Sequence, residues 1–332
     1  MPAVACAKAR ANVALVKYWG KRIGPGNLPA VGSLSLTLDG LLAIARVGPR
    51  TEGSPAFLNR AQPVGGVAAE RMEAFLDRLR GLVPDAPPLA VDVEVNFPVG
   101  AGLASSAAIF CSTTAAALSV LGVVCDRSQL SRLAREGSGS AARSVHGGFV
   151  EWRRGVRPDG EDSVAEPLLA AEAWPLAMAV AVVEPGPKAF ASRDAMAHVA
   201  ATSPFFAAWV QAQEADLVSA RAALVARDLE SLGRITEENC LRMHATCHLA
   251  RPAILYARPA TLAAIGEIRR MRADGLAAWF TMDAGPQVKA LCRAEDLEAV
   301  AQRLSVVPGV RQVLRAGAGP GVEMLEGDVP WR

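Results

Sequence analysis

The stretch "NFPVGAGLASSAAIFC", residues 96–111, runs from a strand-like segment through a glycine-rich loop into small, helix-forming residues. Two interpretations of it are open. It is either a plain turn before a tightly packed helix, or a set of backbone N–H groups at a helix N-terminus that binds phosphate. The loop lacks the Gly-Lys-Ser/Thr of a Walker A motif and the acidic residue that follows a dinucleotide-binding GxGxxG. By itself it is therefore weak evidence for a phosphate site.

The composition narrows the class of protein. With 332 residues the chain can bury a large core and is expected to form two domains. Hydrophobic residues make up 51% of it and the net charge is only +2, which gives no electrostatic case for a nucleic acid or a membrane surface as partner. The six cysteines form no CxxC pair and no signal peptide precedes them. We therefore expect reduced thiols and a cytoplasmic protein.

The uncharged run from Val95 to Cys125 is long enough to cross a bilayer. It begins with turn residues, however, and contains six serines and threonines. These features favour a helix packed inside a soluble protein, and we expect no membrane span.

A second local cluster is "CLRMHATCH", residues 240–248. Helical spacing could place four side chains near one face as zinc ligands: Cys240, His244, Cys247 and His248. Structural zinc sites usually take their ligands from two separated segments. The preferred interpretation is a helix with half-buried polar residues.

Hydrophobic periodicity predicts a mixture of strands and helices in two units. In the first unit we expect two short strands around Asp39-Gly40 within 33–47, a helix at 68–83 and a strand at 89–97. The second unit begins near residue 175. Its expected elements are a buried strand within 175–188, a helix at 215–234, a strand–turn–strand at 275–292, a helix at 294–304 and a final strand with a glycine turn at 310–325.

The segment "ANVALVKYWGKR", residues 11–22, places Lys17 and Lys21 four residues apart. They are two of only five lysines in the chain. The plain interpretation is a strand end with solvated lysines. The functional one is a pair of ammonium groups aimed at phosphate oxygens, and it is favoured here.

Two further segments carry polar groups at positions where they could bind an anion or take part in catalysis. In "SGSAARSVHGGFVEW", residues 138–152, the Ser-Gly-Ser start could form another anion nest and Arg143 could bind a carboxylate or phosphate. His146 is more typical of a packing residue. In "TMDAGPQVK", residues 281–289, Asp283 stands at the end of an apolar strand, where turn capping and a partly desolvated functional carboxylate are equally open.

Taken together, these segments resemble the diphosphomevalonate decarboxylases of the GHMP kinase superfamily. The resemblance rests on "KYWGKR", "SLSLTL", "NFPVGAGLASSAA", "SGSAARSVHGGFVEW", "MHA" and "TMDAGP", in this order, and covers most of the chain from Ala11 to "AGAGPGVEML" at 316–325. It implies an α+β, two-domain GHMP kinase fold. Residues 1–175 would form a domain like ribosomal protein S5 domain 2, and residues 176–332 a ferredoxin-like domain carrying the catalytic aspartate.

The resemblance also implies ATP, Mg²⁺, a phosphorylated small-molecule substrate and a homodimer, while the composition leads us to expect no nucleic acid or membrane partner. The matching catalytic residues are Asp283, Lys17 and Arg143. The matching substrate-binding residues are Tyr18, Lys21, Ser138, Ser140, Ser192 and Arg193. The matching ATP-phosphate residues are Gly100, Gly102, Leu103, Ala104, Ser105 and Ser106, of which Ser106 is also a candidate Mg²⁺ contact.

The activity implied is 3-phosphorylation of mevalonate 5-diphosphate followed by decarboxylation to isopentenyl diphosphate, with CO₂, ADP and phosphate released. The chain departs from the family pattern near the expected substrate site, at Arg22-Ile23, Ala30-Val31-Gly32, Ala142, His146 and Ala191. Four alternatives stay open: a mevalonate 5-phosphate decarboxylase, a decarboxylase of a related hydroxy acid, a kinase that does not decarboxylate, and a catalytically silent binding protein.

Overall fold

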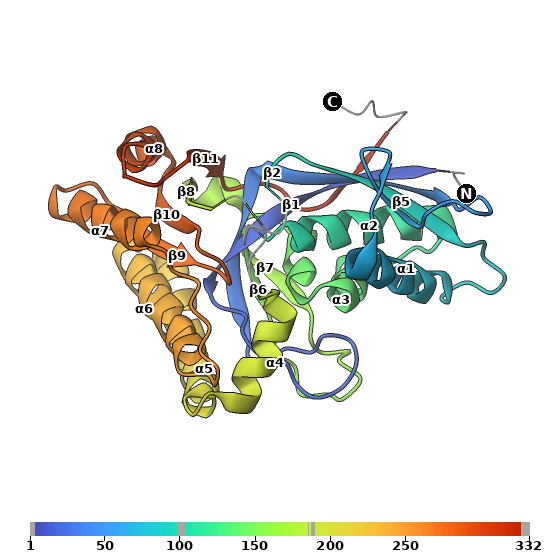
Figure 1. Ribbon diagram of the computed structural model, residues 1–332, viewed down its shortest axis with the longest axis horizontal. Helices are drawn as coiled ribbons and strands as arrows, with labels where there is room; N and C mark the ends of the chain where they lie inside the picture. Colours follow the sequence, from blue (N-terminus) through green and yellow to red (C-terminus); the bar gives the residue numbers. More distant parts are fainter. Residues whose placement is uncertain (1–3, 99–103, 185, 187–189, 327–332) are drawn as a thin grey trace.

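The computed structural model describes residues 4–98, 104–184, 186 and 190–326. Gly100, Gly102 and Leu103, predicted to bind ATP phosphates, lie outside the described residues. The described chain forms two sheets with helices packed on both (Figure 1). The expected α+β composition is confirmed.

The first sheet is built around two long antiparallel strands, β1 and β2. The order of its strands is β12-β1-β2-β5-β3-β4, and β6 pairs with both β2 and β7. The bounds are β1 Ala5–Val16, β2 Ser33–Pro49, β3 Phe57–Asn59, β4 Gln62–Pro63, β5 Leu89–Val95, β6 Phe149–Trp152, β7 Ala165–Leu169 and β12 Glu323–Leu325. Because β1 is covered on both faces, almost all of its residues are buried.

The expectation of two short strands around Asp39-Gly40 is wrong. Residues 33–49 form the single strand β2, and its pairing with β1 shifts between the pairs Arg10–Leu42 and Asn12–Thr37. Residues 38–41 therefore form a bulge instead of reversing the chain. Arg10 lies across the bulge and donates from Nε to Oδ1 of Asp39 over 2.8 Å, so that a long-range ion pair replaces the local turn expected from the Asp-Gly sequence.

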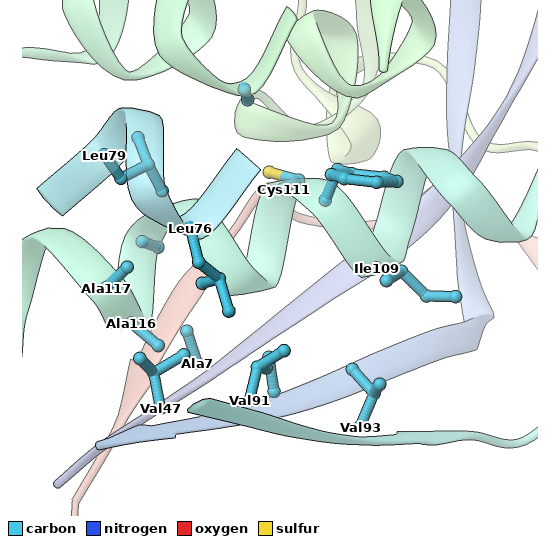
Figure 2. Packing of buried hydrophobic residues seen from close by; sticks show 14 of the residues in the cluster. Ala7, Val47, Leu76, Leu79, Val91, Val93, Ile109, Cys111, Ala116 and Ala117 are labelled. Atoms are coloured by element: carbon cyan, nitrogen blue, oxygen red, sulfur yellow. The ribbon is translucent and has the colours of Figure 1, made fainter. Parts of the chain in front are cut away.

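Three helices cover one face of the first sheet: α1 Gly66–Arg80, α2 Ser105–Leu121 and α3 Arg127–Gly137. Figure 2 shows Leu76 of α1 and Ile109 and Ala116 of α2 on the side of these helices that faces the strands. Ala116 and Ala117 of α2 lie near Ala7 and Val47, and such small residues let helix and sheet approach closely. Residues 105–121 of the uncharged run thus form an internal helix. Within the described part of the chain, no helix combines the length and apolarity needed to span a bilayer.

The second sheet is antiparallel, with the order β11-β8-β10-β9. Its strands are β8 Leu176–Val182, β9 Ala278–Met282, β10 Val288–Arg293 and β11 Gln312–Gly317. Helices α7 Pro259–Ala273 and α8 Leu297–Ser305 pack on one face of it. Helices α5 Phe206–Ala226 and α6 Leu229–His248 pack on the other, where they share a core with β1 and β2. This shared core ties the two sheets together.

The helix expected at 215–234 is interrupted. Helix α5 ends at Ala226, Arg227 adopts a left-handed conformation with φ of 52°, and α6 begins at Leu229. Asp228 caps α6, since its side chain accepts a hydrogen bond from the backbone N–H of Ser231 over 3.0 Å. The remaining elements are α4 Ser192–Thr202 and three short 3₁₀ helices: η1 Gly139–Val145, η2 Ala171–Ala173 and η3 Ala294–Asp296.

Close backbone approach requires four glycines of the "HGG" and "AGAGPG" segments: Gly147, Gly148, Gly319 and Gly321. A Cβ on Gly147 would lie 2.7 Å from both Gly319 O and Pro320 Cα. Beyond this crossing the chain returns to the first sheet, where β12 pairs with β1. The division of the chain into domains after residue 175 stays a prediction.

Candidate active site

A cavity of about 330 Å³ is lined by residues from both halves of the chain. All of the predicted site residues that the structure describes line it: Lys17, Tyr18, Lys21, Ala104, Ser105, Ser106, Ser138, Ser140, Arg143, Ser192, Arg193 and Asp283. Among the residues that sequence analysis did not single out, Asn12, Asn27 and Arg71 line it as well. Segments separated by more than 250 residues in the sequence thus share one cavity wall.

Asp283 lies in the turn between β9 and β10, and its carboxylate is held at both oxygens. Lys17 Nζ lies 2.9 Å from Oδ1, and Lys289 Nζ lies 2.9 Å from Oδ2. Both lysine side chains are only 1% exposed. Sequence analysis missed Lys289, although a lysine inside the apolar strand "VKALC" is itself a signal, because a buried ammonium group needs an anionic partner.

Burial alone would raise the pKa of Asp283, but the ammonium groups of Lys17 and Lys289 outweigh it and hold that pKa well below its usual value. Asp283 is therefore a carboxylate at neutral pH. For Lys289, burial and the charge of Lys17 lower the pKa against the opposing pull of Asp283. The result is a compact buried cluster of two cations around one anion.

The backbone of Lys17 is held by two amide side chains. Its N–H donates to Oδ1 of Asn239 on α6 over 2.7 Å, and its carbonyl accepts from Nε2 of Gln213 on α5 over 2.7 Å. Asn239 also donates to Gln213 over 2.9 Å. This buried network fixes the end of β1 against the two helices. Sequence analysis missed it because a single amide on an amphipathic helix carries no spacing signal.

Arg143 lies in η1 and is 3% exposed. Its Nε donates to Oδ1 of Asn12 over 3.0 Å, and its Nη1 donates to the hydroxyl of Ser33 over 2.6 Å. Burial lowers the pKa of Arg143 to about 10, so the guanidinium stays charged at neutral pH. Strands β1 and β2 therefore hold one edge of a cation that lines the cavity.

Tyr18 packs edge-on against Trp152, with ring centroids 4.7 Å apart. Its hydroxyl is buried and has no hydrogen-bond partner among the described residues. The hydroxyl reaches so close to Gly139 that a Cβ there would lie 2.6 Å from it. Because buried polar groups in native structures are almost always paired, this hydroxyl on the cavity wall is suited to hydrogen-bond a ligand.

Three cations gather at one end of the cavity: Lys21, Arg71 and Arg193. Asn27 accepts hydrogen bonds from Lys21 Nζ over 2.7 Å and from Arg193 over 3.3 Å. Within the part of the chain that is described, none of the three forms an ion pair with a carboxylate. Burial, with help from Arg193 and Arg71, lowers the pKa of Lys21 to about 8. A multiply charged anion bound here would relieve this mutual repulsion.

The N-terminus of α2 opens on the same cavity. Its N-cap residue Ala104 is left-handed, with φ of 57°, and provides no side-chain cap. Ser105 and Ser106 follow in the first turn, and the hydroxyl of Ser106 lies 3.1 Å from that of Ser138. Uncapped N–H groups and the helix dipole favour a bound anion at this place.

The donor set near α2 consists of hydroxyl groups. Among the described residues, no group of three or more His, Cys, Asp or Glu side chains could hold a metal ion. Mg²⁺ generally keeps several waters and is bound largely through substrate phosphates. The hydroxyls of Ser106 and Ser138 therefore fit a magnesium ion carried by phosphate oxygens.

The candidate zinc segment forms part of α6. There the thiol of Cys240 accepts a hydrogen bond from the backbone N–H of Met282 over 3.1 Å and so joins α6 to β9. His244 is buried, and burial together with the nearby charge of Lys17 lowers its pKa to about 3. It is a neutral imidazole at physiological pH.

Comparison with known proteins agrees with this geometry. A model described as "Diphosphomevalonate decarboxylase-like N-terminal domain" matches residues 9–165, and one described as "Mevalonate 5-diphosphate decarboxylase C-terminal domain" matches residues 178–316. A diphosphomevalonate decarboxylase of Aspergillus fumigatus is 34% identical over 91% of this chain and 80% of its own length. The chain belongs to the diphosphomevalonate decarboxylase family.

Solved structures support the same assignment. A structure described as "MDDEF in complex with MVAPP, AMPPCP and Magnesium" is 37% identical, covers 98% of this chain and 99% of its own, and superposes with a TM-score of 0.91. The mevalonate diphosphate decarboxylase of Staphylococcus aureus is 32% identical over the same shares of both chains, also with a TM-score of 0.91. The two-domain fold expected from the resemblance is confirmed for this member of the decarboxylase family.

Proposed function

We propose that the protein catalyses the ATP-dependent decarboxylation of (R)-mevalonate 5-diphosphate to isopentenyl diphosphate, with release of CO₂, ADP and phosphate. The observation that carries this proposal is the Asp283 carboxylate, held between Lys17 and Lys289 on the wall of a cavity that Arg143 and the open N-terminus of α2 also line. A relative of the same fold was solved with MVAPP, AMPPCP and magnesium.

Asp283 would orient the tertiary 3-hydroxyl and accept its proton as the oxygen attacks the γ-phosphate of ATP. A carboxylate between two ammonium groups is a weak base. Proton transfer would therefore come late, when the new phosphorus–oxygen bond has already made the hydroxyl proton acidic. Phosphoryl transfer tolerates this order because its transition state is loose and depends mainly on positioning and charge neutralisation. Lys17 lies where its ammonium group would offset the charge of the transferred phosphoryl group.

Arg143 would hold the substrate carboxylate. The bonds to Asn12 and Ser33 use Nε–H and one N–H of Nη1, which leaves the second N–H of Nη1 and the two of Nη2 as donors for a carboxylate. When the 3-phosphate leaves with the electron pair of its carbon–oxygen bond, cationic character develops at C3. The electron pair of the bond to the carboxylate then forms the new double bond and CO₂ is released. A fixed carboxylate keeps the breaking bond aligned with the departing phosphate.

The cationic end of the cavity favours a 5-diphosphate over a 5-monophosphate. Lys21, Arg71 and Arg193 supply three positive charges, and the unpaired hydroxyl of Tyr18 adds a donor. Ser138, Ser140 and Ser192 line the same cavity and would complete this subsite. A diphosphate carries more negative charge and more acceptor oxygens than a monophosphate, so it makes fuller use of these groups.

ATP would place its phosphates at the N-terminus of α2, against Ala104, Ser105 and Ser106, and the predicted contacts at Gly100, Gly102 and Leu103 would belong to the same subsite. Mg²⁺, when bound to those phosphates, would neutralise part of their charge, with Ser106 as its protein contact. The cytoplasmic location and the homodimer are further parts of the proposal. Sedimentation of the purified protein tests the homodimer.

The deciding experiment supplies the purified protein with Mg²⁺–ATP and, in separate reactions, mevalonate, its 5-phosphate and its 5-diphosphate. ADP and CO₂ are measured together. Equal amounts of both products, with the highest kcat/KM for the diphosphate, are expected. A preference for the monophosphate would contradict the proposed anion subsite, and ADP without CO₂ would make the protein a kinase.

A further inference from the structure

Lys289 is placed beside Asp283 by the register of the second sheet. On β10, Val288, Ala290 and Cys292 pack in the core beneath α7 and α8, whereas Leu291 packs on the opposite face with α5 and α6. Because side chains alternate along a strand, Lys289 shares the face of Leu291. Lys289 pairs with Thr281 across the hairpin, and Asp283 follows two residues after Thr281 on the same face.

Lys289 reaches Asp283 from behind the cavity wall. Lys17, Arg143 and Asp283 all line the cavity, whereas Lys289 is not among the described residues that do so. Its side chain is 1% exposed, and its Nζ lies 2.9 Å from Oδ2 of Asp283. Lys289 forms an ion pair with Asp283, and this carboxylate is the cavity-lining group through which Lys289 would act on a ligand.

Several elements present titratable groups toward Asp283. They are Lys17 at the end of β1, Arg143 of η1, Cys240 and His244 of α6, and Lys289 of β10. Burial raises the pKa of the Cys240 thiol and lowers that of His244, so both groups are neutral at physiological pH. The positive charge around this carboxylate therefore comes from Lys17, Lys289 and Arg143.

These three cations have different further partners. In the proposed function, Arg143 binds the substrate carboxylate and Lys17 binds the transferred phosphoryl group. Both cations therefore interact with a ligand as well as with Asp283. Because Lys289 lies behind the wall, it would keep its contact with Asp283 throughout the reaction. We propose that Lys289 is a positioning residue that fixes Asp283 through Oδ2 and keeps it ionised while Lys17 and Arg143 engage the ligands. This inference rests on the proposed role of Asp283 as the proton acceptor.

The first test measures the ionisation of Asp283 without turnover. Aspartate labelled with ¹³C at the carboxyl carbon is titrated by NMR in the ligand-free protein, and Asp283→Asn identifies the resonance. In the wild type we expect a pKa below the ordinary value of about 3.9. In Lys289→Met it should rise by about 1–3 pH units, the usual effect of one close opposite charge.

Lys8→Met is the matched control, because Lys8 also pairs with a carboxylate, that of Glu323, but at the surface. It should leave the Asp283 resonance unchanged. An ordinary pKa in the wild type, or an unchanged pKa in Lys289→Met, would overturn the inference. Even if Lys289→Met does not fold, the wild-type titration tests whether the pKa of Asp283 is lowered. Lys289→Gln offers a second neutral side chain, for which we expect the same rise in that pKa.

The second test uses turnover. The acid limb of the kcat/KM profile should move to higher pH in Lys289→Met by the shift that NMR records, and Lys289→Arg should keep the wild-type limb. In the Asp283→Asn background, Lys289→Met should cause no further loss of kcat. A full additional loss there would show that Lys289 acts independently of Asp283 and would overturn the inference. A wild type without turnover would refute the proposed function instead, and the NMR titration distinguishes these two failures.

Discussion

The amide oxygen of Asn12 accepts a hydrogen bond from Nε of Arg143 over 3.0 Å, although 131 residues separate the two in the sequence. The same amide donates to the hydroxyl of Ser144 over 2.8 Å and to the carbonyl of Ser140 over 3.0 Å. Asn12 is 1% exposed, so these bonds are made in a buried environment. Strand β1 of the first sheet therefore sets the orientation of the cation that we assign to the substrate carboxylate.

Replacing Asn12 by Ala should weaken substrate binding, because Arg143 would lose the acceptor that orients it. A hydrogen bond to a charged group is worth about 1.5–3 kcal/mol, which corresponds to roughly a 10- to 100-fold rise in KM. Steady-state kinetics with saturating ATP measure it. Asn96→Ala is the control, since Asn96 is exposed and bonds only to the backbone at Gly40 and Leu42. Equal KM values for the two variants would contradict the assignment.

Replacing Asp283 by Asn should remove the proton acceptor while keeping the size of the side chain. We expect kcat to fall by about 10²- to 10⁴-fold, the usual contribution of a general base. The affinity for ATP, measured by calorimetry, should change little because the assigned phosphate subsite lies at α2. A variant with near wild-type kcat would show that another group accepts the proton.

Substrate affinity should depend on the charge of Lys21. Burial, with the charges of Arg193 and Arg71, lowers the pKa of Lys21 to about 8, and a bound diphosphate favours the charged form. Affinity is therefore highest below pH 8 and should fall above it by up to about tenfold per pH unit. Calorimetry between pH 7 and 9.5 measures this fall. Lys21→Arg should hold its affinity across that range, because arginine stays protonated. A parallel fall in the arginine variant would assign the titration to another group.

The crossing of the "HGG" and "AGAGPG" segments should tolerate no side chain at Gly147. A Cβ there would lie 2.7 Å from backbone atoms of Gly319 and Pro320, so the segment would have to shift. We expect Gly147→Ala to lower the free energy of unfolding by about 1–3 kcal/mol. Urea denaturation measures it. Gly266→Ala is the control, because Gly266 lies within α7 with open space around its Cβ position and should stabilise the protein by about 0.5–1 kcal/mol.

Local patterns in the sequence were sufficient to predict most of the helices and strands. The 3.6-residue period of 68–83 predicted α1, and the alternation of 89–97 predicted β5. They failed where long-range contacts override a local signal. Asp39-Gly40 has the chemistry of a hairpin turn, yet Arg10 and the pairing with β1 keep residues 33–49 in one strand.

The residues of the candidate site also fall into those that local sequence patterns predict and those that only long-range contacts reveal. Lys17, Arg143 and Asp283 stand in short motifs with unusual composition, so their chemistry could be recognised without coordinates. Asn12 and Arg71 stand in ordinary strand and helix patterns, and the apolar strand around Lys289 indicates a buried charge without naming its partner. Their roles depend on which side chain lies opposite them in space, and a pattern of neighbours along the chain does not contain that information.

The sequence by itself determined the fold family, the order of the elements and the residue types available for phosphoryl transfer, because these depend on local periodicity and on motifs. Only the tertiary structure decided that Asp283 lies between two lysines, that Asn12 orients Arg143 and that Lys21 and Arg193 meet at Asn27. These relationships join segments up to 266 residues apart. Their strength comes from burial, which removes the water that would otherwise screen the charges and compete for the hydrogen bonds.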